Sequence, residues 1–300
     1  MPAAVHLSPA GFRRAFFFLG AAALAPAAAH CQNHAYRPLP GYVQLGKPDQ
    51  DEGRRILAEF RGGGMMHIEG DYYLEFQLRQ MPRRGPEHLF AGRMWGGRNG
   101  QGSATRVTLV EEGGDRRLLV QDGREPGVWS WGGHPGDPVV RLSGAALFAP
   151  LAQTELTAFD LQRPFFAWPD FAYEGIAKIR GRPAYQFLLH PPADFAADYP
   201  ALTGVRLSLD TVFRQPVQWE EIGEGGRLLR SVMIQELKKV GERWLPESLD
   251  VRNEVTHDKT RLNLTAAALD KSWPAARFEP SALPADLAAP PPDRLIGFQP

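Results

Sequence analysis

Residue types that carry out hydrolysis, redox chemistry or metal binding do not occur here at their usual spacings. The sequence has no G-x-S-x-G nucleophile motif, no H-E-x-x-H zinc motif and no C-x-x-C pair. The six histidines from His34 to His257 are scattered and never fall at a metal-ligand spacing. We therefore expect no catalytic residue, no metal site, no cofactor and no enzyme activity.

Two weaker patterns could still carry chemistry. Glu220, Glu221 and Glu224 could form an acid/base group, but adjacent carboxylates on a strand point to opposite faces, and next to a glycine-rich turn we expect them to be solvated. The glycine-rich stretch Gly92 to Gly102 could hold a phosphate. It lacks the strand-to-helix context and the Lys-Ser/Thr ending of a P-loop, so we interpret its glycines as turn residues.

The second half of the chain, Tyr173 to Leu264, predicts six or seven short amphipathic strands. Val205, Leu207 and Leu209 alternate with polar residues, so one face of that strand should be buried and the other wet. The same period of two recurs at 217–219, 249–255 and 262–264, with glycine turns between the runs. Such spacings favour antiparallel hairpins.

A second set of strands is predicted between Met65 and Trp131, after one helix. Negative charge from Asp49 to Glu52, an apolar face and the stop at 62–64 predict a helix of roughly 12 residues. The predicted strands are 68–79, 88–98, 104–111, 116–122 and 127–131, joined by tight Asn-Gly and Asp-Gly type turns.

The segment 137–171 interrupts the strands with apolar and aromatic residues in irregular order. It could form a helical lid over a sheet, or a loop that plugs the core end of a twisted sheet. Both alternatives use the same residues, so the sequence leaves them open.

The two ends of the chain differ from its middle. Residues 1–31 predict a signal peptide, with Arg13-Arg14 before a short apolar run and cleavage near Ala29 or Cys31, which places the protein in the periplasm. We expect an extended arm at 32–48 and an extended or disordered Pro-rich tail at 279–300. With 34 basic and 34 acidic residues, nucleic acid is not an expected partner.

The order of several weak motifs resembles the outer-membrane lipoprotein-sorting proteins, the LolA-like superfamily. These motifs are Trp168 to Gly175 after the aromatic segment, Arg182 to Leu189, Val205 to Asp210 followed by Gln215 to Glu220, and Arg243 to Leu249 with its W-x-P step. The resemblance covers most of 49–278. No single arginine of the sequence matches the arginine that contacts the lid in this family.

The resemblance implies an α+β fold, mostly antiparallel β, in which a curved incomplete β-barrel carries a helical or loop lid over an apolar cavity. In the family this cavity receives acyl chains of lipoproteins or other lipids, handed from an inner-membrane donor to an outer-membrane acceptor protein. Each methylene moved into such a cavity is worth about 0.8 kcal/mol, so binding is easy and release needs a mobile lid. The ligand-binding candidates are Phe148, Phe165, Phe166, Trp168 and Phe171 at the lid or rim, and Trp129, Phe187, Leu207, Leu209 and Trp219 on the sheet.

We therefore expect a periplasmic carrier or binder of lipidated proteins or other acyl-chain ligands, delivering them toward the outer membrane. The alternative is a non-catalytic envelope assembly or structural factor whose β core is filled by its own side chains. A hydrolase with a site assembled from separated residues is a third possibility, and would show as buried titratable groups converging in a cleft.

Overall fold

The computed structural model describes residues 48–63, 68 and 70–298. The predicted signal peptide and its cleavage sites lie outside these residues, as does nearly all of the predicted arm at 32–48. Within the described part, no helix combines the length and apolar character needed to cross a membrane.

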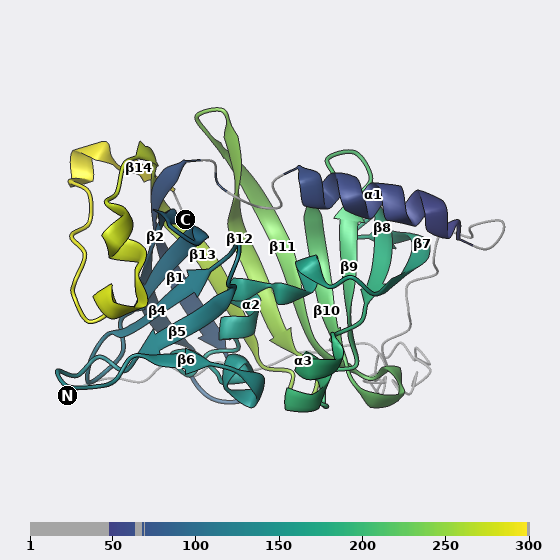
Figure 1. Cartoon of the computed structure of the whole chain (residues 1–300), viewed down its shortest axis with the longest axis horizontal. Coiled ribbons are helices and arrows are strands. Elements are labelled where there is room, and N and C mark those ends of the chain that lie inside the picture. Colours follow the sequence, from purple (N-terminus) through teal and green to yellow (C-terminus); the bar gives the residue numbers. More distant parts are fainter. Residues whose placement is uncertain (1–47, 64–67, 69, 299–300) are drawn as a thin grey trace, which may run out of the picture. The chain divides into compact units, whose positions relative to one another are not determined.

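The described residues form one 14-stranded sheet in which the paired strands are antiparallel (Figure 1). The strands are β1 Asp71–Met81, β2 His88–Asn99, β3 Gly102–Leu109, β4 Arg116–Gln121, β5 Gly127–Trp131, β6 Val140–Leu142, β7 Phe171–Ile179, β8 Arg182–Leu189, β9 Gly204–Asp210, β10 Pro216–Ile222, β11 Leu228–Val240, β12 Arg243–Asn253, β13 Lys259–Lys271 and β14 Ile296–Gly297. The five strands predicted at 68–131 and the strands predicted from Tyr173 onward are therefore confirmed, with shifts of at most three residues in the first set.

The order of the strands determines what covers the sheet. It runs from β6 through β1 in reverse, then from β13 down to β7, so β6 and β7 are the two edges and are not paired with each other. The sheet is an incomplete barrel, as predicted. Because β6 and β7 are consecutive in the chain, the connection between them, residues 143–170, must pass from one edge to the other. We call this connection the lid segment, and the side it covers the lid face.

Helix α1, Gln50–Gly62, packs beside the edge strand β7, and its prediction from the sequence is confirmed. The Asp49 side chain accepts a hydrogen bond from the backbone N–H of Asp51 at 2.9 Å and begins the helix. The amide of Gln50 donates to the carbonyl of Tyr173 at 2.8 Å and accepts from its N–H at 2.9 Å. This side chain thus pairs backbone groups that an edge strand leaves open. Ile56, Leu57 and Phe60 are buried in the same core as the lid segment.

Three of the glycines in the stretch Gly92 to Gly102 serve side-chain packing. Gly92, Gly96 and Gly97 lie inside β2, so the interpretation of these three as turn residues is wrong, whereas Gly100 and Gly102 do lie at the β2–β3 turn. A Cβ at Gly92 would lie 2.1 Å from the ring of Phe76, its partner on β1. Glycine is needed at Gly92 and Gly96 because a Cβ there would overlap an aromatic ring of β1, and at Gly97 because it would overlap the ring of Phe278.

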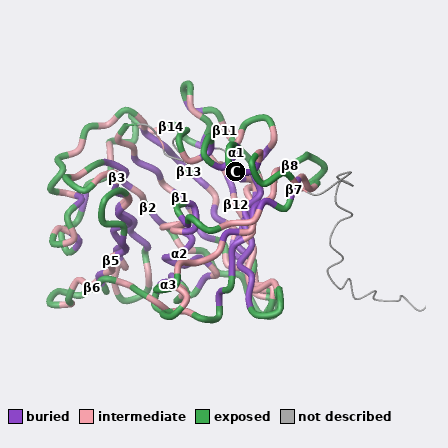
Figure 2. The backbone as a smooth tube through the Cα atoms, turned by 45° about the vertical axis from the view of Figure 1, so that its right-hand side comes forward, coloured by how far each residue is buried: buried purple, intermediate pink, exposed green. Residues whose placement is uncertain are grey.

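The C-terminal segment 273–298 covers the other side of the sheet, which we call the back face. The strands of the sheet carry long buried stretches (Figure 2), and the isolated buried residues of this segment, Phe278, Leu283 and Leu287, pack against Tyr73, Trp95 and Leu119 of the sheet. Residues 279–298 are irregular chain with short helical turns, and their packing on the sheet contradicts the disordered alternative of the prediction.

This segment is held in place by two arginines of the sheet, which its Pro-rich composition does not reveal. Arg106, 1% exposed, donates hydrogen bonds to the carbonyls of Ala282 at 2.8 Å and Leu283 at 2.9 Å. Arg117 donates to the carbonyl of Pro284 at 2.6 Å. Residues that lack regular hydrogen bonds of their own are thereby fixed by arginines of β3 and β4.

We predict that Gly92→Ala lowers the free energy of unfolding by about 1–3 kcal/mol, because the added methyl group would overlap the Phe76 ring and force it out of its rotamer. Gly100→Ala is the matched control, since a Cβ there has nothing within 4 Å. Urea denaturation compares the two variants. Equal stability of both would show that the ring contact does not constrain β2.

Candidate functional site

The lid segment consists of three short helical turns. They are η1 Gly144–Phe148, α2 Ala158–Gln162 and η2 Pro164–Ala167. Thr157 begins α2 with a capping box: its hydroxyl accepts from the N–H of Asp160 at 3.3 Å, and the Asp160 carboxylate accepts from the N–H of Thr157 at 2.9 Å. The sequence left a helical lid and a plugging loop open for 137–171. The structure combines features of both, since short helical turns are joined by irregular chain.

An aromatic cluster fills the space between the lid segment and the sheet. Phe159 and Phe165 are 0% exposed, and their ring centroids lie 5.6 Å apart. Phe165 lies 6.1 Å from the ring of Trp219 on β10, and Phe166 packs edge-on against Phe60 of α1 at 5.2 Å. These contacts join the lid segment to both the sheet and α1.

Nine of the ten predicted ligand-binding candidates lie in this one core or pack against it. They are Phe148, Phe165, Phe166, Trp168, Phe171, Phe187, Leu207, Leu209 and Trp219. The alternation predicted for β9 is confirmed on this side, since Val205, Leu207 and Leu209 are all fully buried. Whether these residues bind a ligand is a separate question, because burial in a core is also their ordinary structural role.

The tenth candidate, Trp129, was predicted to line the cavity on the lid face, but it lies on the back face. It packs with the back-face core, and the guanidinium carbon of Arg141 lies 5.5 Å from its ring centroid. In β5 the neighbouring Val128 is fully buried in the lid-face core. Successive side chains alternate across a strand, so Trp129 must point the other way.

The nine candidates on the lid face pack against one another and against the lid segment in this structure. A cavity of about 290 Å³ lies among β1 to β4, and another of about 420 Å³ lies beside the β11–β12 turn. Neither is lined by the nine aromatic and aliphatic candidates. An acyl chain could therefore reach these residues only if the lid segment moves away from the sheet.

An arginine of the sheet holds the lid segment by charge. Arg230 on β11 donates to the Asp160 carboxylate at 2.7 Å and to the Glu221 carboxylate at 2.6 Å, and it also bonds the carbonyl of Glu155. Burial lowers the pKa of Arg230, but the two carboxylates more than offset this, so its pKa is raised and it stays charged. Arg61 at the end of α1 donates to the carbonyl of Phe166 at 2.7 Å.

The Arg230 ion pairs leave one carboxylate in excess. Burial raises the pKa of Glu221 to about 7; Arg230 opposes the shift and the nearby Asp160 adds to it. With Glu221 protonated, one guanidinium faces one carboxylate, which is the less costly arrangement in a buried site.

The expectation that Glu220 and Glu221 are solvated is wrong. They do point to opposite faces, but Glu220 is 4% and Glu221 3% exposed. Arg206 on the back-face side donates to Glu220 at 3.3 Å and to Glu174 at 2.6 Å. The back face of β9 is accordingly polar without being wet, and Ser208 is 2% exposed.

Several residues that contact the lid segment were not predicted from the sequence. Two rings in and just after α3, Ala193–Asp198, pack against the lid segment. Tyr199 stacks on Phe148 with 3.8 Å between the ring centroids, and Phe195 meets Phe148 edge-on. The T-x-x-D spacing of Thr157 and Asp160 is a capping signature and could have located α2. No local pattern marks Arg230, because its partners lie 9 and 70 residues away.

Comparison with known proteins identifies the family. A family model described as "Uncharacterized protein" matches residues 135–285, half of the chain. The chain belongs to this family. No curated protein matches the sequence significantly.

Solved structures show that the fold is LolA-like, as the sequence resemblance implied. A domain described as outer membrane lipoprotein-sorting, from Vibrio parahaemolyticus, is 17% identical over 79% of this chain and all of its own, with a TM-score of 0.66. A DUF1329 family protein from Desulfovibrio piger is 16% identical over 79% of this chain and 100% of its own, with a TM-score of 0.64. A LolA superfamily protein from Nitrosomonas europaea is 16% identical over 75% of this chain and 96% of its own, with a TM-score of 0.57.

The described residues bring together no three His, Cys, Asp or Glu side chains that could hold a metal ion. The buried titratable groups that do converge, Glu221, Arg230 and Asp160, are bonded to one another and to the lid segment.

We predict a pH dependence of stability from Glu221. Its pKa rises from 4.5 to about 7 on folding, so the folded protein keeps a proton that the unfolded chain releases. This contribution to the unfolding free energy is complete below about pH 4.5 and is lost as the pH rises through 7. Urea denaturation from pH 5 to 8 should show this fall in the wild type, and Glu221→Gln should lack it.

The exposed Glu224→Gln is the control and should keep the wild-type profile. Parallel profiles for the wild type and Glu221→Gln would contradict the assignment.

Proposed function

We propose that this protein is a non-catalytic, periplasmic binder of acyl-chain ligands such as lipidated proteins, which it holds under the lid segment. The carrying observation is the edge-to-edge passage of residues 143–170 over an apolar sheet face, where the segment contributes rings and not backbone pairing. The LolA-like fold supports the proposal, since the similar Vibrio domain is described as lipoprotein-sorting. The predicted signal peptide supports the location.

An acyl chain would replace side-chain contacts that are already present. The rings of the lid segment now occupy the apolar face of the sheet, and a twelve-carbon chain moved from water into the same place gains about 9 kcal/mol. Displacing the rings costs part of this gain. Binding is therefore an exchange of ring contacts for chain contacts, which also provides a route for release when the segment returns.

In this proposal Arg230 has the role of a latch. Its ion pair with Asp160 joins the sheet to α2, so the closed state is favoured by charge as well as by packing. The protein would hand its ligand toward the outer membrane, from an inner-membrane donor to an outer-membrane acceptor.

One observation favours the alternative, a structural or assembly factor with a filled β core. The residues proposed to line an apolar cavity contact each other directly. The two functions differ in whether the lid segment opens for an acyl chain.

We predict that the wild-type chain binds a fluorescent dodecanoyl probe with micromolar affinity, and that Arg230→Gln binds it about fivefold more tightly. Loss of the latch raises the fraction of molecules with an open lid, and apparent affinity increases with that fraction. Probe anisotropy measures both. The exposed Arg227→Gln removes the same charge and should bind as the wild type does.

Circular dichroism would be used to check that each variant is folded. If neither the wild type nor Arg230→Gln binds the probe, the carrier proposal fails and the filled-core alternative stands.

A further inference from the structure

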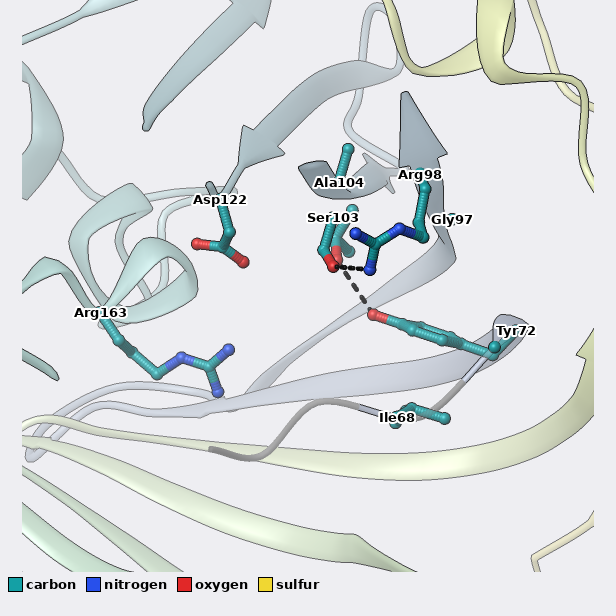
Figure 3. Close-up of a pocket in the computed structure, with 10 residues that line it drawn as sticks. Ile68, Tyr72, Gly97, Arg98, Ser103, Ala104, Asp122 and Arg163 are labelled. Atoms are coloured by element: carbon teal, nitrogen blue, oxygen red, sulfur yellow. Dashed lines mark hydrogen bonds between the residues drawn. The ribbon is translucent and has the colours of Figure 1, made fainter. Parts of the chain in front are cut away.

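A polar cavity of about 290 Å³ lies on the lid face, where β1 to β4 meet the lid segment (Figure 3). Three charged residues line it: Arg98 from β2, Asp122 just after β4, and Arg163 at the end of α2. Figure 3 shows the Arg163 guanidinium and the Tyr72 hydroxyl directed into the space between them. Sheet and lid segment therefore both contribute to this cavity.

The hydroxyl-bearing wall of the cavity depends on Gly96. A Cβ at Gly96 would lie 1.9 Å from the ring of Tyr72, its cross-strand partner on β1. Because glycine leaves this space empty, the ring crosses β2 and its hydroxyl lies 3.0 Å from the hydroxyl of Thr105 on β3. Arg98 donates to the Ser103 hydroxyl at 3.3 Å nearby. Three hydroxyl groups and a guanidinium are thus gathered along one wall.

Arg163 connects the cavity to the aromatic cluster. Its backbone is left-handed, with φ 51° and ψ 51°, and its N–H donates to the carbonyl of Phe159 at 2.8 Å to end α2. A residue other than glycine adopts this conformation at a cost of about 1 kcal/mol. Its guanidinium carbon lies 5.6 Å from the ring centroid of Phe166. A ligand that contacted Arg163 would thus lie beside the apolar core of the lid segment.

The charge balance favours an anion. Two guanidinium groups, Arg98 and Arg163, line the cavity with one carboxylate, Asp122. Burial lowers the pKa of Arg163, and the neighbouring Asp122 opposes this shift. The cavity thus carries one net positive charge, with hydroxyl donors placed to share an anion's oxygens. Its volume is at the lower end for ligand sites, about 300 Å³, which suits a headgroup and not a whole lipid.

We propose that this cavity binds the anionic head, a phosphate or a carboxylate, of an amphiphile whose acyl chain lies under the lid segment. The inference rests on the proposed function and adds the class of its ligand: an acyl chain with an anionic group at one end. An anion between Arg98 and Arg163 would also join the sheet to the end of α2.

The test compares three probes by isothermal titration calorimetry: dodecyl phosphate, uncharged dodecanol, and inorganic phosphate without a chain. We expect the wild type to bind dodecyl phosphate at least tenfold more tightly than either of the others. Arg98→Gln and Arg163→Gln should each weaken dodecyl phosphate about tenfold, the factor for one lost charge-assisted hydrogen bond, and leave dodecanol unchanged. Arg84→Gln, at an exposed arginine outside the cavity, is the charge-matched control.

Any other result of these titrations would contradict either the headgroup site or the proposed function. Equal affinity for dodecyl phosphate and dodecanol, unaffected by either substitution, would refute the headgroup site and leave acyl-chain binding intact. Inorganic phosphate binding as tightly as dodecyl phosphate would make the cavity a site for free anions, and the headgroup assignment would be wrong. No binding of either chain-bearing probe would refute the proposed function and this inference with it. Because Arg98 is exposed, its substitution tests the site without disturbing the core.

Discussion

The edge-to-edge connection of the sheet is the constraint on which the rest of the structure depends. The chain finishes six strands at β6, and its next strand, β7, lies at the far edge. Residues 143–170 must therefore cross one face, and a crossing segment that pairs with no strand needs side chains to hold it. The rings of Phe159, Phe165 and Phe166 meet that need by burial against the sheet and α1.

Packing and charge act together on the crossing segment. Burying Arg230 with Asp160 and Glu221 costs desolvation energy, and such groups are often replaceable by apolar residues without loss of stability. Their presence at the junction of sheet and lid segment is easier to understand if the junction has to separate. An ion pair becomes hydrated when it opens, whereas a purely apolar contact would expose only surface that water solvates poorly.

Local patterns were sufficient for β1 to β5 and β7 to β13, but they missed the short strands β6 and β14 and failed where distant parts of the chain meet. Alternation at Val205, Leu207 and Leu209 identified their face correctly, because a period of two is a local property. Trp129 was assigned to the wrong face, since its residue type fits either core and only Val128 beside it determines the direction.

Long-range partners explain the other failures. Pro-rich composition suggested a disordered end for 279–298, but its carbonyls are bonded by Arg106, more than 170 residues earlier. Gly92 and Gly96 looked like turn residues, and their role depends on the rings of a neighbouring strand. The same holds for Arg230, which no motif marks. Sequence patterns report the local conformation of a residue and do not report which distant side chain it meets.

The most direct test of the central claim is to identify the molecules that are bound to the protein when it is purified from the periplasm. The chain from Gln32 onward, purified from a bacterial periplasm, can be extracted with organic solvent and the extract analysed by mass spectrometry. The account predicts close to one equivalent of an acyl lipid or lipopeptide per protein molecule. A protein that carries no such molecule, and that also takes up none when incubated with phospholipid vesicles, would contradict it.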